Sequence, residues 1–117
     1  MSFKNQFSFN NRILEARRIL TKYPDRIPII CEKSKNHNLP YINKNKYLVT
    51  HDLTISQFIY VIRNRMKLSP EFALFLLING HIPSSSTMIG ELYEQHKDKD
   101  GFLYLEYCQE NTFGCHF

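Results

Sequence analysis

The chain has no tryptophan, only four glycines, and no apolar run of the length that a membrane-spanning helix requires. The longest such run, Phe72–Ile78, has seven residues, whereas a transmembrane helix needs roughly 20. The glycines are scattered, so none builds a Gly-rich loop that cradles phosphate. These absences argue against a transmembrane protein and against a P-loop nucleotide-binding protein.

Cysteine is also scarce. Cys31, Cys108 and Cys115 are three in number and form no CxxC pair, so neither a disulfide framework nor a zinc knuckle is indicated. The first residues, MSFKNQFSFNNR, lack the apolar segment and the small-residue cleavage site of a secretory signal. We therefore expect a cytoplasmic protein.

The charged residues are unevenly distributed. Residues 1–70 hold 13 Lys and Arg against 4 Asp and Glu, whereas residues 71–117 hold 2 against 7. A basic first part of this kind can attract nucleic acid, anionic lipid or acidic peptides. Charge alone does not distinguish among these partners.

A chain of 117 residues, 43% of them hydrophobic, is long enough for one domain with one core. Apolar residues with helical spacing predict a helix over residues 9–20, which ends before Pro24. Strands are predicted over residues 26–31 and 46–49, with a polar loop between them. Pro28 lacks a backbone N–H donor, so the strand over residues 26–31 is expected at an edge of the sheet, or Pro28 at a position where the missing donor is harmless.

The second half begins with the clearest helix, residues 52–66, in which Thr54 and Gln57 have the spacing of a capping box. A buried strand over residues 72–78, a short helix capped by Thr87 and a last strand over residues 102–107 complete the pattern. This order predicts an α+β fold with helices on one face of a mixed sheet. It is the β-grasp order of ubiquitin, preceded by a helix.

A catalytic site is poorly supported. Five histidines and three cysteines are present, but a Cys/His nucleophile pair must converge in space, and their spacing does not show that. His37 and His51 fall in predicted loops, and Cys31 in a strand is more typical of a small core residue. Cys115 and His116 are too few to form a stable metal site. We expect no catalytic residues, no cofactor and no metal.

Two kinds of binding remain. Nucleic acid would need aromatic side chains interleaved with the cations, and this pattern is absent around Lys44, Lys46, Arg63, Arg65 and Lys67. A basic edge strand can instead pair with an extended peptide, and residues 46–49 have that character. Peptide binding is the better prediction, although any edge strand shares this signal.

Four longer segments narrow the interpretation. YPDRIPIICEK (23–33), KYLVTHDLTISQFIYVIRNR (46–65), HKDKDGFLY (96–104) and ENTFG (110–114) closely resemble the autophagy ubiquitin-like modifiers of the GABARAP and microtubule-associated light chain type. The resemblance extends from about Phe3 to Gly114. It implies a ubiquitin-like β-grasp domain with two additional N-terminal helices over residues 1–114, and a removable tail over residues 115–117.

The same resemblance implies how the protein is used. A cysteine protease cuts between Gly114 and Cys115, with Phe113 helping recognition. Activating and conjugating enzymes then join the Gly114 carboxylate to phosphatidylethanolamine. The protein is thus expected to be a substrate rather than an enzyme. It would be cytoplasmic at first, and bound to autophagosome or related vesicle membranes once lipidated. A glycine suits this role because it lacks a Cβ and can pass through narrow active sites.

Relatives of this type bind cargo receptors and adaptors through motifs with an aromatic residue, two spacers and an aliphatic residue, added as a parallel strand. Seven residues match the aromatic subsite: Glu15, Ile19, Pro28, Ile30, Lys46, Leu48 and Phe102. Six match the aliphatic subsite: Tyr47, Val49, Leu53, Phe58, Val61 and Ile62. Acidic flanks of the peptide would meet Arg26, Lys44, Lys46 and Arg65.

Some positions depart from the family pattern, most clearly Thr50, where relatives carry proline after the second strand. Phe58 and Ile62 also lie on the apolar stripe of their helix, so core packing is an alternative role for both. An alternative function is a soluble or organelle-associated trafficking adaptor that uses the same groove. The basic first part fits acidic peptides better than nucleic acid, so we expect no nucleic-acid partner.

Overall fold

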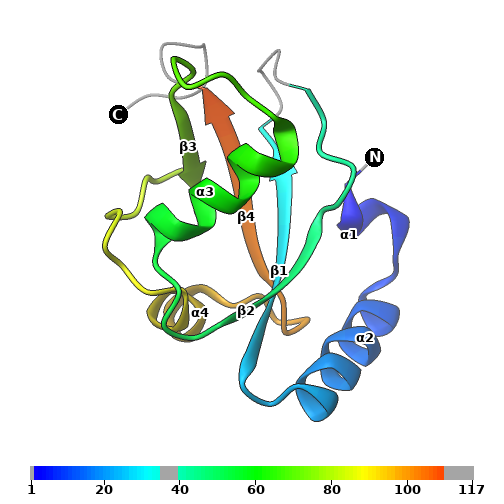
Figure 1. Ribbon diagram of the computed structural model, residues 1–117. Coiled ribbons are helices and arrows are strands. Elements are labelled where there is room, and N and C mark those ends of the chain that lie inside the picture. Colours follow the sequence, from blue (N-terminus) through cyan, green and yellow to red (C-terminus); the bar gives the residue numbers. More distant parts are fainter. Residues whose placement is uncertain (1, 35–39, 110–117) are drawn as a thin grey trace.

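In the computed structural model, which describes residues 2–34 and 40–109, one four-stranded sheet is surrounded by four helices (Figure 1). The helices are α1 (Phe3–Gln6), α2 (Phe9–Lys22), α3 (Ile55–Met66) and α4 (Ile89–His96). The strands are β1 (Arg26–Lys33), β2 (Lys46–Thr50), β3 (Leu74–Leu77) and β4 (Leu103–Gln109).

The strands lie in the order β2-β1-β4-β3. The first strand pairs antiparallel with β2 and parallel with β4, and β3 pairs antiparallel with β4. This is the mixed sheet of a β-grasp domain, as the sequence predicted. The order leaves β2 and β3 at the two edges of the sheet.

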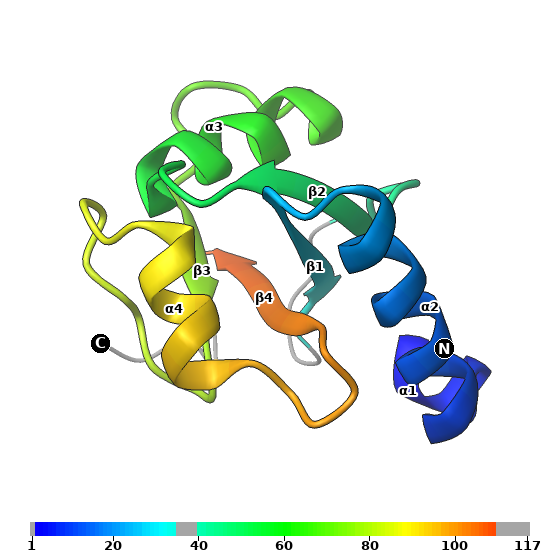
Figure 2. The same ribbon diagram turned by 90° about the horizontal axis from the view of Figure 1, so that it is seen from below.

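Helices cover both faces of the sheet, which corrects the expectation that they lie on one face (Figure 2). On one face, α3 and α4 pack on the main core through residues such as Phe58, Ile62 and Leu92. On the other face, α1 and α2 pack through Phe3 and Ile19 on a second cluster. Successive side chains along a strand point to opposite faces of the sheet, so the same strands contribute residues to both clusters.

The third helix has the predicted capping box, although it begins at Ile55 rather than at residue 52. Thr54 is its N-cap, and the Thr54 side chain accepts from the Gln57 N–H while the Gln57 side chain accepts from the Thr54 N–H. This capping box satisfies two backbone donors that the first turn would otherwise leave free. At the other end Lys67 closes the helix in the left-handed region, with φ 55°.

Pro28 does not lie in an edge strand, because β1 is flanked by β2 and β4. The Cys31 N–H donates to Asn45 O on the β2 side, so alternation turns the nitrogen of Pro28 toward β4. Pairing with β4 begins only at Ile29 opposite Leu103. Pro28 therefore lies at a position where its missing N–H donor is harmless, as the second of the two expectations stated. Its absence costs no hydrogen bond to a neighbouring strand.

The predicted cap of the fourth helix is wrong. Met88, not Thr87, is the N-cap of α4, and it makes no side-chain cap hydrogen bond. Thr87 O instead accepts from the Ile55 N–H at the start of α3. Over the residues that the structure describes, no helix is long and apolar enough to span a bilayer.

Candidate functional site

The candidate peptide site lies along β2, whose outer edge is paired with no other described strand. Its residues alternate between the two faces of the sheet. Leu48 packs on the cluster beneath α2, whereas Tyr47 and Val49 pack on the core beneath α3. An extended peptide added here would alternate in the same way.

The residues predicted for the aromatic subsite come together between α2 and β2, but most of them lie inside the fold. Ile19, Ile30 and Phe102 are at most 3% exposed, and Pro28 is also buried. Half-buried members form the outer part: Glu15, Lys46 and Leu48. The buried members can line the base of a subsite, and the half-buried ones are those that a ligand would contact first.

The aliphatic subsite has the same division. Tyr47, Phe58 and Ile62 are buried in the main core, with the Tyr47 and Phe58 rings edge to face at 5.4 Å. The remaining three residues are half-buried between β2 and α3: Val49, Leu53 and Val61. Core packing thus accounts for Phe58 and Ile62 in the structure described.

The cations expected to meet an acidic flank are accessible. Arg26, Lys44 and Arg65 are exposed, and the Lys44 ammonium lies 5.1 Å from the centre of the Tyr47 ring. Burial raises the pKa of Tyr47, so its hydroxyl stays protonated and neutral at physiological pH. Arg26 lies opposite Thr50 at the end of β2, whereas Lys44 precedes Lys46 at its start, so exposed positive charge lies near both ends of this strand.

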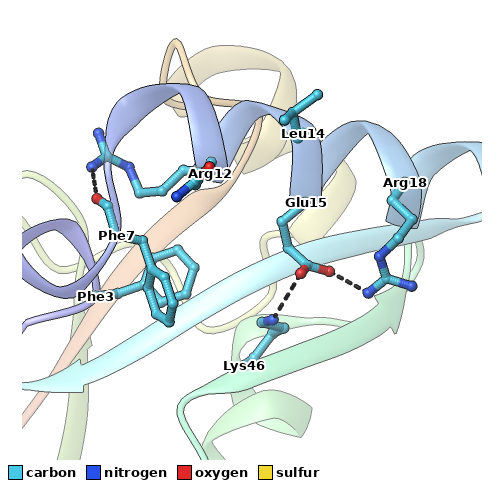
Figure 3. A pocket seen from close by; sticks show the side chains of 8 residues that line it. Phe3, Phe7, Arg12, Leu14, Glu15, Arg18 and Lys46 are labelled. Carbon is cyan, nitrogen blue, oxygen red and sulfur yellow. Dashed lines mark hydrogen bonds and ion pairs between the residues drawn. The ribbon is translucent and has the colours of Figure 1, made fainter.

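Lys46 connects β2 to the two N-terminal helices. Its ammonium lies 3.9 Å from a carboxylate oxygen of Glu15, and Glu15 also pairs with Arg18 (Figure 3). The same ammonium lies 5.7 Å from the centre of the Phe3 ring. These contacts frame a hollow of about 380 Å³, lined by Phe3, Phe7, Asn11, Arg12, Leu14, Glu15, Arg18 and Lys46.

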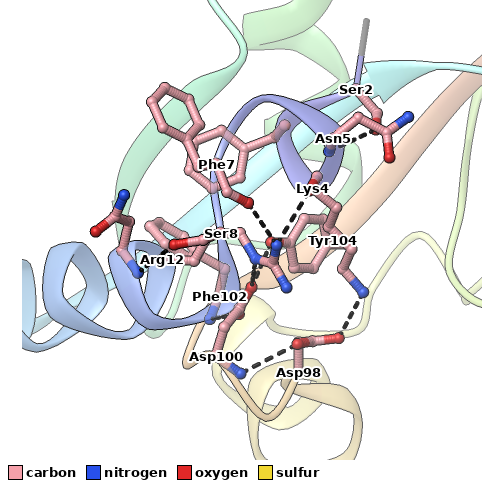
Figure 4. A network of polar contacts seen from close by, with 12 residues as sticks. Ser2, Lys4, Asn5, Phe7, Ser8, Arg12, Asp98, Asp100, Phe102 and Tyr104 are labelled. Atoms are coloured by element: carbon pink, nitrogen blue, oxygen red, sulfur yellow. Dashed lines mark hydrogen bonds and ion pairs between the residues drawn. The ribbon is translucent and has the colours of Figure 1, made fainter.

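A polar network fixes the N-terminal helices to the domain (Figure 4). The Arg12 guanidinium donates to Asp100 at 2.9 Å and to the carbonyl oxygens of Lys4 and Phe7. Asp100 also accepts from the Tyr104 hydroxyl, and burial followed by this carboxylate raises the pKa of Tyr104. Sequence patterns gave no sign of this network, since its members lie at opposite ends of the chain.

Two further contacts hold α1. The Phe3 N–H donates to a Glu32 carboxylate oxygen at 2.7 Å, and Lys4 pairs with Asp98 at 2.8 Å. The Phe3 ring is 4% exposed and meets the Phe102 ring edge to face at 5.2 Å. The first helix is therefore packed as part of the domain, next to the base of the predicted aromatic subsite.

The structure describes Cys31 and His51 among the groups weighed for a catalytic pair. Cys31 is fully buried, and burial, followed by Glu32 and Glu106, raises the pKa of its thiol. His51 is exposed, as predicted. Across residues 2–34 and 40–109, no three His, Cys, Asp or Glu residues are grouped so as to hold a metal ion. Gly114, Phe113 and Cys115 lie outside the described residues.

Comparisons with known proteins agree with this geometry. A family model described as "Autophagy protein Atg8 ubiquitin like" matches residues 11–114. The chain is 54% identical to Autophagy-related protein 8 of Mycosarcoma maydis over 113 residues, covering 97% of this chain and 96% of that protein. It is 53% identical to the Schizosaccharomyces pombe protein of the same name over 115 residues, covering 98% and 95%.

Solved structures show the same fold. The crystal structure of Trypanosoma brucei ATG8 superposes with a TM-score of 0.91 at 40% identity, covering 97% of each chain. Plasmodium falciparum Atg8, solved in complex with a Plasmodium falciparum Atg3 peptide, gives a TM-score of 0.86 at 34% identity, covering 97% of this chain and 99% of that one. The fold and the family model define a ubiquitin-like domain. The chain belongs to the Atg8 family of autophagy proteins.

Proposed function

We propose that this protein is a ubiquitin-like modifier that is trimmed after Gly114 and conjugated through that residue to phosphatidylethanolamine. Residues 115–117 are then a removable tail on a single domain of residues 1–114. In this role the protein serves autophagosome formation and recruits cargo receptors and adaptors. Membership of the Atg8 family is the observation that carries the proposal.

Other proteins would supply the chemistry. A cysteine protease exposes the Gly114 carboxylate, and activating and conjugating enzymes transfer it to the lipid amine. The complex of Plasmodium falciparum Atg8 with a Plasmodium falciparum Atg3 peptide supports contact between this fold and the conjugation machinery. The chain itself would act as the carried group.

Lipid attachment would change the location of the protein. One acyl chain gives only marginal membrane binding, whereas two chains anchor a protein stably. Phosphatidylethanolamine has two chains, so conjugation would move the domain from the cytoplasm to autophagosome or related vesicle membranes. Cleavage of the bond would release it again.

Peptide recruitment is supported by the alternation of β2. A parallel strand at its free edge would place side chains three positions apart on opposite faces of the sheet. An aromatic residue could then approach Lys46 and Leu48 beside α2, while an aliphatic residue three positions later approaches Val49 beside α3. The exposed cations would attract acidic residues in the same peptide.

Intact mass in a host-cell extract tests the conjugation. We expect loss of residues 115–117 followed by the mass gain of one phospholipid, and we expect Gly114→Ala to block the gain. A Gly114→Ala chain that is trimmed and lipidated as fast as the parent would contradict the proposal. A chain truncated before Gly114 that keeps full cellular function would favour the soluble adaptor instead.

Calorimetry with a synthetic acidic peptide carrying Trp-x-x-Leu tests the binding edge. Leu48→Ala removes a half-buried contact without opening the main core, and we expect binding to weaken about 10-fold. Tyr60→Ala is the matched control, because Tyr60 is an exposed side chain on α3. Equal binding by all three proteins would reject this edge as the peptide site.

A further inference from the structure

A second hollow, of about 480 Å³, lies at the C-terminal end of α3. Its lining comes from α3 and from the residues that follow it: Tyr60, Arg63, Asn64, Lys67, Leu68 and Pro70. The four residues from α3 and its cap are spaced three or four positions apart, so they share one side of the helix, turned away from the buried Phe58 and Ile62. None of the six belongs to the predicted peptide subsites. We call this site the α3 hollow.

The strand register places the α3 hollow at the end of the domain where the chain leaves β4. Gln109, the last residue of β4, lies opposite Leu74, the first residue of β3. The connection from α3 to β3, residues 67–73, therefore lies at the same end of the sheet as the tip of β4 (Figure 1). Gly114 is only five positions after Gln109, and five residues of extended chain span at most about 18 Å. A lipid attached to Gly114 would hold this end of the domain close to the bilayer.

Positive charge is in excess around the α3 hollow. Arg63, Arg65 and Lys67 are followed by a single acidic residue, Glu71, before β3 begins. None of the ion pairs among residues 2–34 and 40–109 involves Arg63 or Lys67. The C-terminal end of a helix carries about half a negative charge, so this end and Glu71 together offset about half of the three positive charges. The remaining excess attracts anions.

Apolar and aromatic surface adjoins these cations. The Tyr60 side chain is 64% exposed and that of Phe72 is 37% exposed. The segment that carries Phe72 is joined to the helix, because the Arg63 guanidinium donates to Ser69 O at 3.4 Å and Leu68 packs against the main core. Aromatic rings favour the headgroup level of a bilayer, and cations beside them meet anionic lipid. The helix side offers no strand edge to an extended peptide, so a lipid surface fits it better than a peptide does.

We propose that the α3 hollow docks the protein on anionic lipid headgroups of the membrane to which it is attached, with Arg63 and Lys67 contacting the headgroups and Phe72 entering the interface. The inference rests on the proposed attachment through Gly114. It adds a preferred orientation of the attached domain on bilayers that contain an anionic lipid such as phosphatidylserine. Because β2 runs antiparallel to β1, and β1 runs parallel to β4, β2 extends away from this end, and peptides could still reach its edge.

Docking of the full chain on vesicles tests the site without relying on lipidation. A hexahistidine tag placed after Phe117 tethers the protein to phosphatidylcholine vesicles that contain a nickel-chelating lipid, with or without phosphatidylserine. The chain has no tryptophan, so Phe72→Trp introduces a single fluorescent reporter. We expect its emission to shift to the blue, and to be quenched by brominated lipid, when phosphatidylserine is present. Tyr23→Trp is the matched reporter at the opposite end of the sheet, before the start of β1, and it should show neither effect.

Charge variants in the Phe72→Trp chain test the two cations. A Lys or Arg near an anionic surface contributes about 1 kcal/mol, so Arg63→Gln with Lys67→Gln should lower the ratio of docked to undocked protein roughly 30-fold. Arg17→Gln with Lys22→Gln removes the same charge from exposed positions on α2 and should leave the ratio nearly unchanged. Equal losses in the two double variants would assign the attraction to net charge and overturn the site.

Two further results would overturn the docking site alone: equal quenching of the Phe72→Trp and Tyr23→Trp reporters, or quenching of Phe72→Trp that does not depend on phosphatidylserine. The intact-mass measurement in host-cell extract reports separately on attachment. A chain that docks when tethered but gains no phospholipid there would overturn the proposed function, and with it the docking of an attached protein. A chain that is lipidated but does not dock would overturn only the present inference.

Discussion

Arg12 on α2 donates to Asp100 before β4 at 2.9 Å, although the two residues are 88 positions apart in the chain. The Asp100 side chain is fully buried and that of Arg12 is 10% exposed. Arg12 also reaches carbonyl oxygens of Lys4 and Phe7. This ion pair therefore joins the N-terminal helices to the ubiquitin-like part of the domain.

Removing one partner of this ion pair should be costly. Arg12→Ala leaves the buried Asp100 carboxylate without its cation, and we expect a loss of about 3 to 5 kcal/mol in the free energy of unfolding. Denaturant unfolding followed by circular dichroism measures it. Arg18→Ala is the control, because its pair with Glu15 is exposed and should contribute less than about 1 kcal/mol. Equal losses in both variants would contradict the assignment.

Asp98 should add a pH-dependent contribution to the same junction. Burial acts to raise the pKa of Asp98, but the hydrogen bonds from the Lys4 ammonium and the Asp100 N–H outweigh it and lower the pKa. A lowered carboxyl pKa stabilises the fold above the unfolded value of about 4, and this contribution is lost as the pH falls through the folded pKa.

The measurement compares the parent with Asp98→Asn between about pH 6 and pH 3. The difference in free energy of unfolding should be full at the upper end and should shrink as the pH falls toward the lowered folded pKa of Asp98. In a Lys4→Met background the difference should be smaller throughout. A difference that grows as the pH falls would have the wrong sign for this carboxylate.

Local patterns predicted the elements whose signals lie within a few residues. The capping box at Thr54 and the apolar stripe of α3 gave its start and its buried face. The prediction that Thr87 caps α4 is wrong. The Thr87 carbonyl oxygen instead accepts a hydrogen bond from the Ile55 N–H, more than 30 positions earlier in the chain. No local pattern encodes such a pairing.

The site was predicted less completely than the fold. Periodicity placed Phe58 and Ile62 on one stripe but could not tell a pocket wall from the core, and both are fully buried. The first helix has four residues and its cap is Ser2, which is too short for periodicity to detect. Its presence came from the family resemblance, and its contacts with Glu32 and Asp98 came only from the structure.

Gly101 allows α2 to approach the turn before β4. It has φ +97°, and a Cβ there would lie 2.9 Å from the Cβ of Ala16. Gly101→Ala should therefore destabilise the fold by about 2 to 4 kcal/mol through the clash and the unfavourable backbone angle. Adding Ala16→Gly should recover the steric part but not the backbone part. Chemical unfolding of the two single variants and the double variant tests this, and fully additive losses would exclude the clash.

Cys31 should be unreactive in the folded protein. It has no exposed surface, and burial with the nearby carboxylates of Glu32 and Glu106 raises the pKa of its thiol. Thiolate is the reactive form, so iodoacetamide should modify Cys31 only after unfolding. Mass spectrometry of the peptide containing Cys31, with and without denaturant, measures this. Rapid native labelling would show that the strand opens more easily than its burial indicates.

Glu15 should reduce the affinity for acidic peptides. Its carboxylate lies 3.9 Å from the Lys46 ammonium and also pairs with Arg18, so it competes with peptide carboxylates for both cations. Glu15→Gln keeps the size of the side chain and removes this competition. We expect the variant to bind an acidic Trp-x-x-Leu peptide several-fold more tightly at low salt, with the gain shrinking as added salt screens the charges. A peptide with neutral flanks is the control and should bind both proteins alike. Weaker binding of the acidic peptide by Glu15→Gln would show instead that Glu15 holds Lys46 in its binding position.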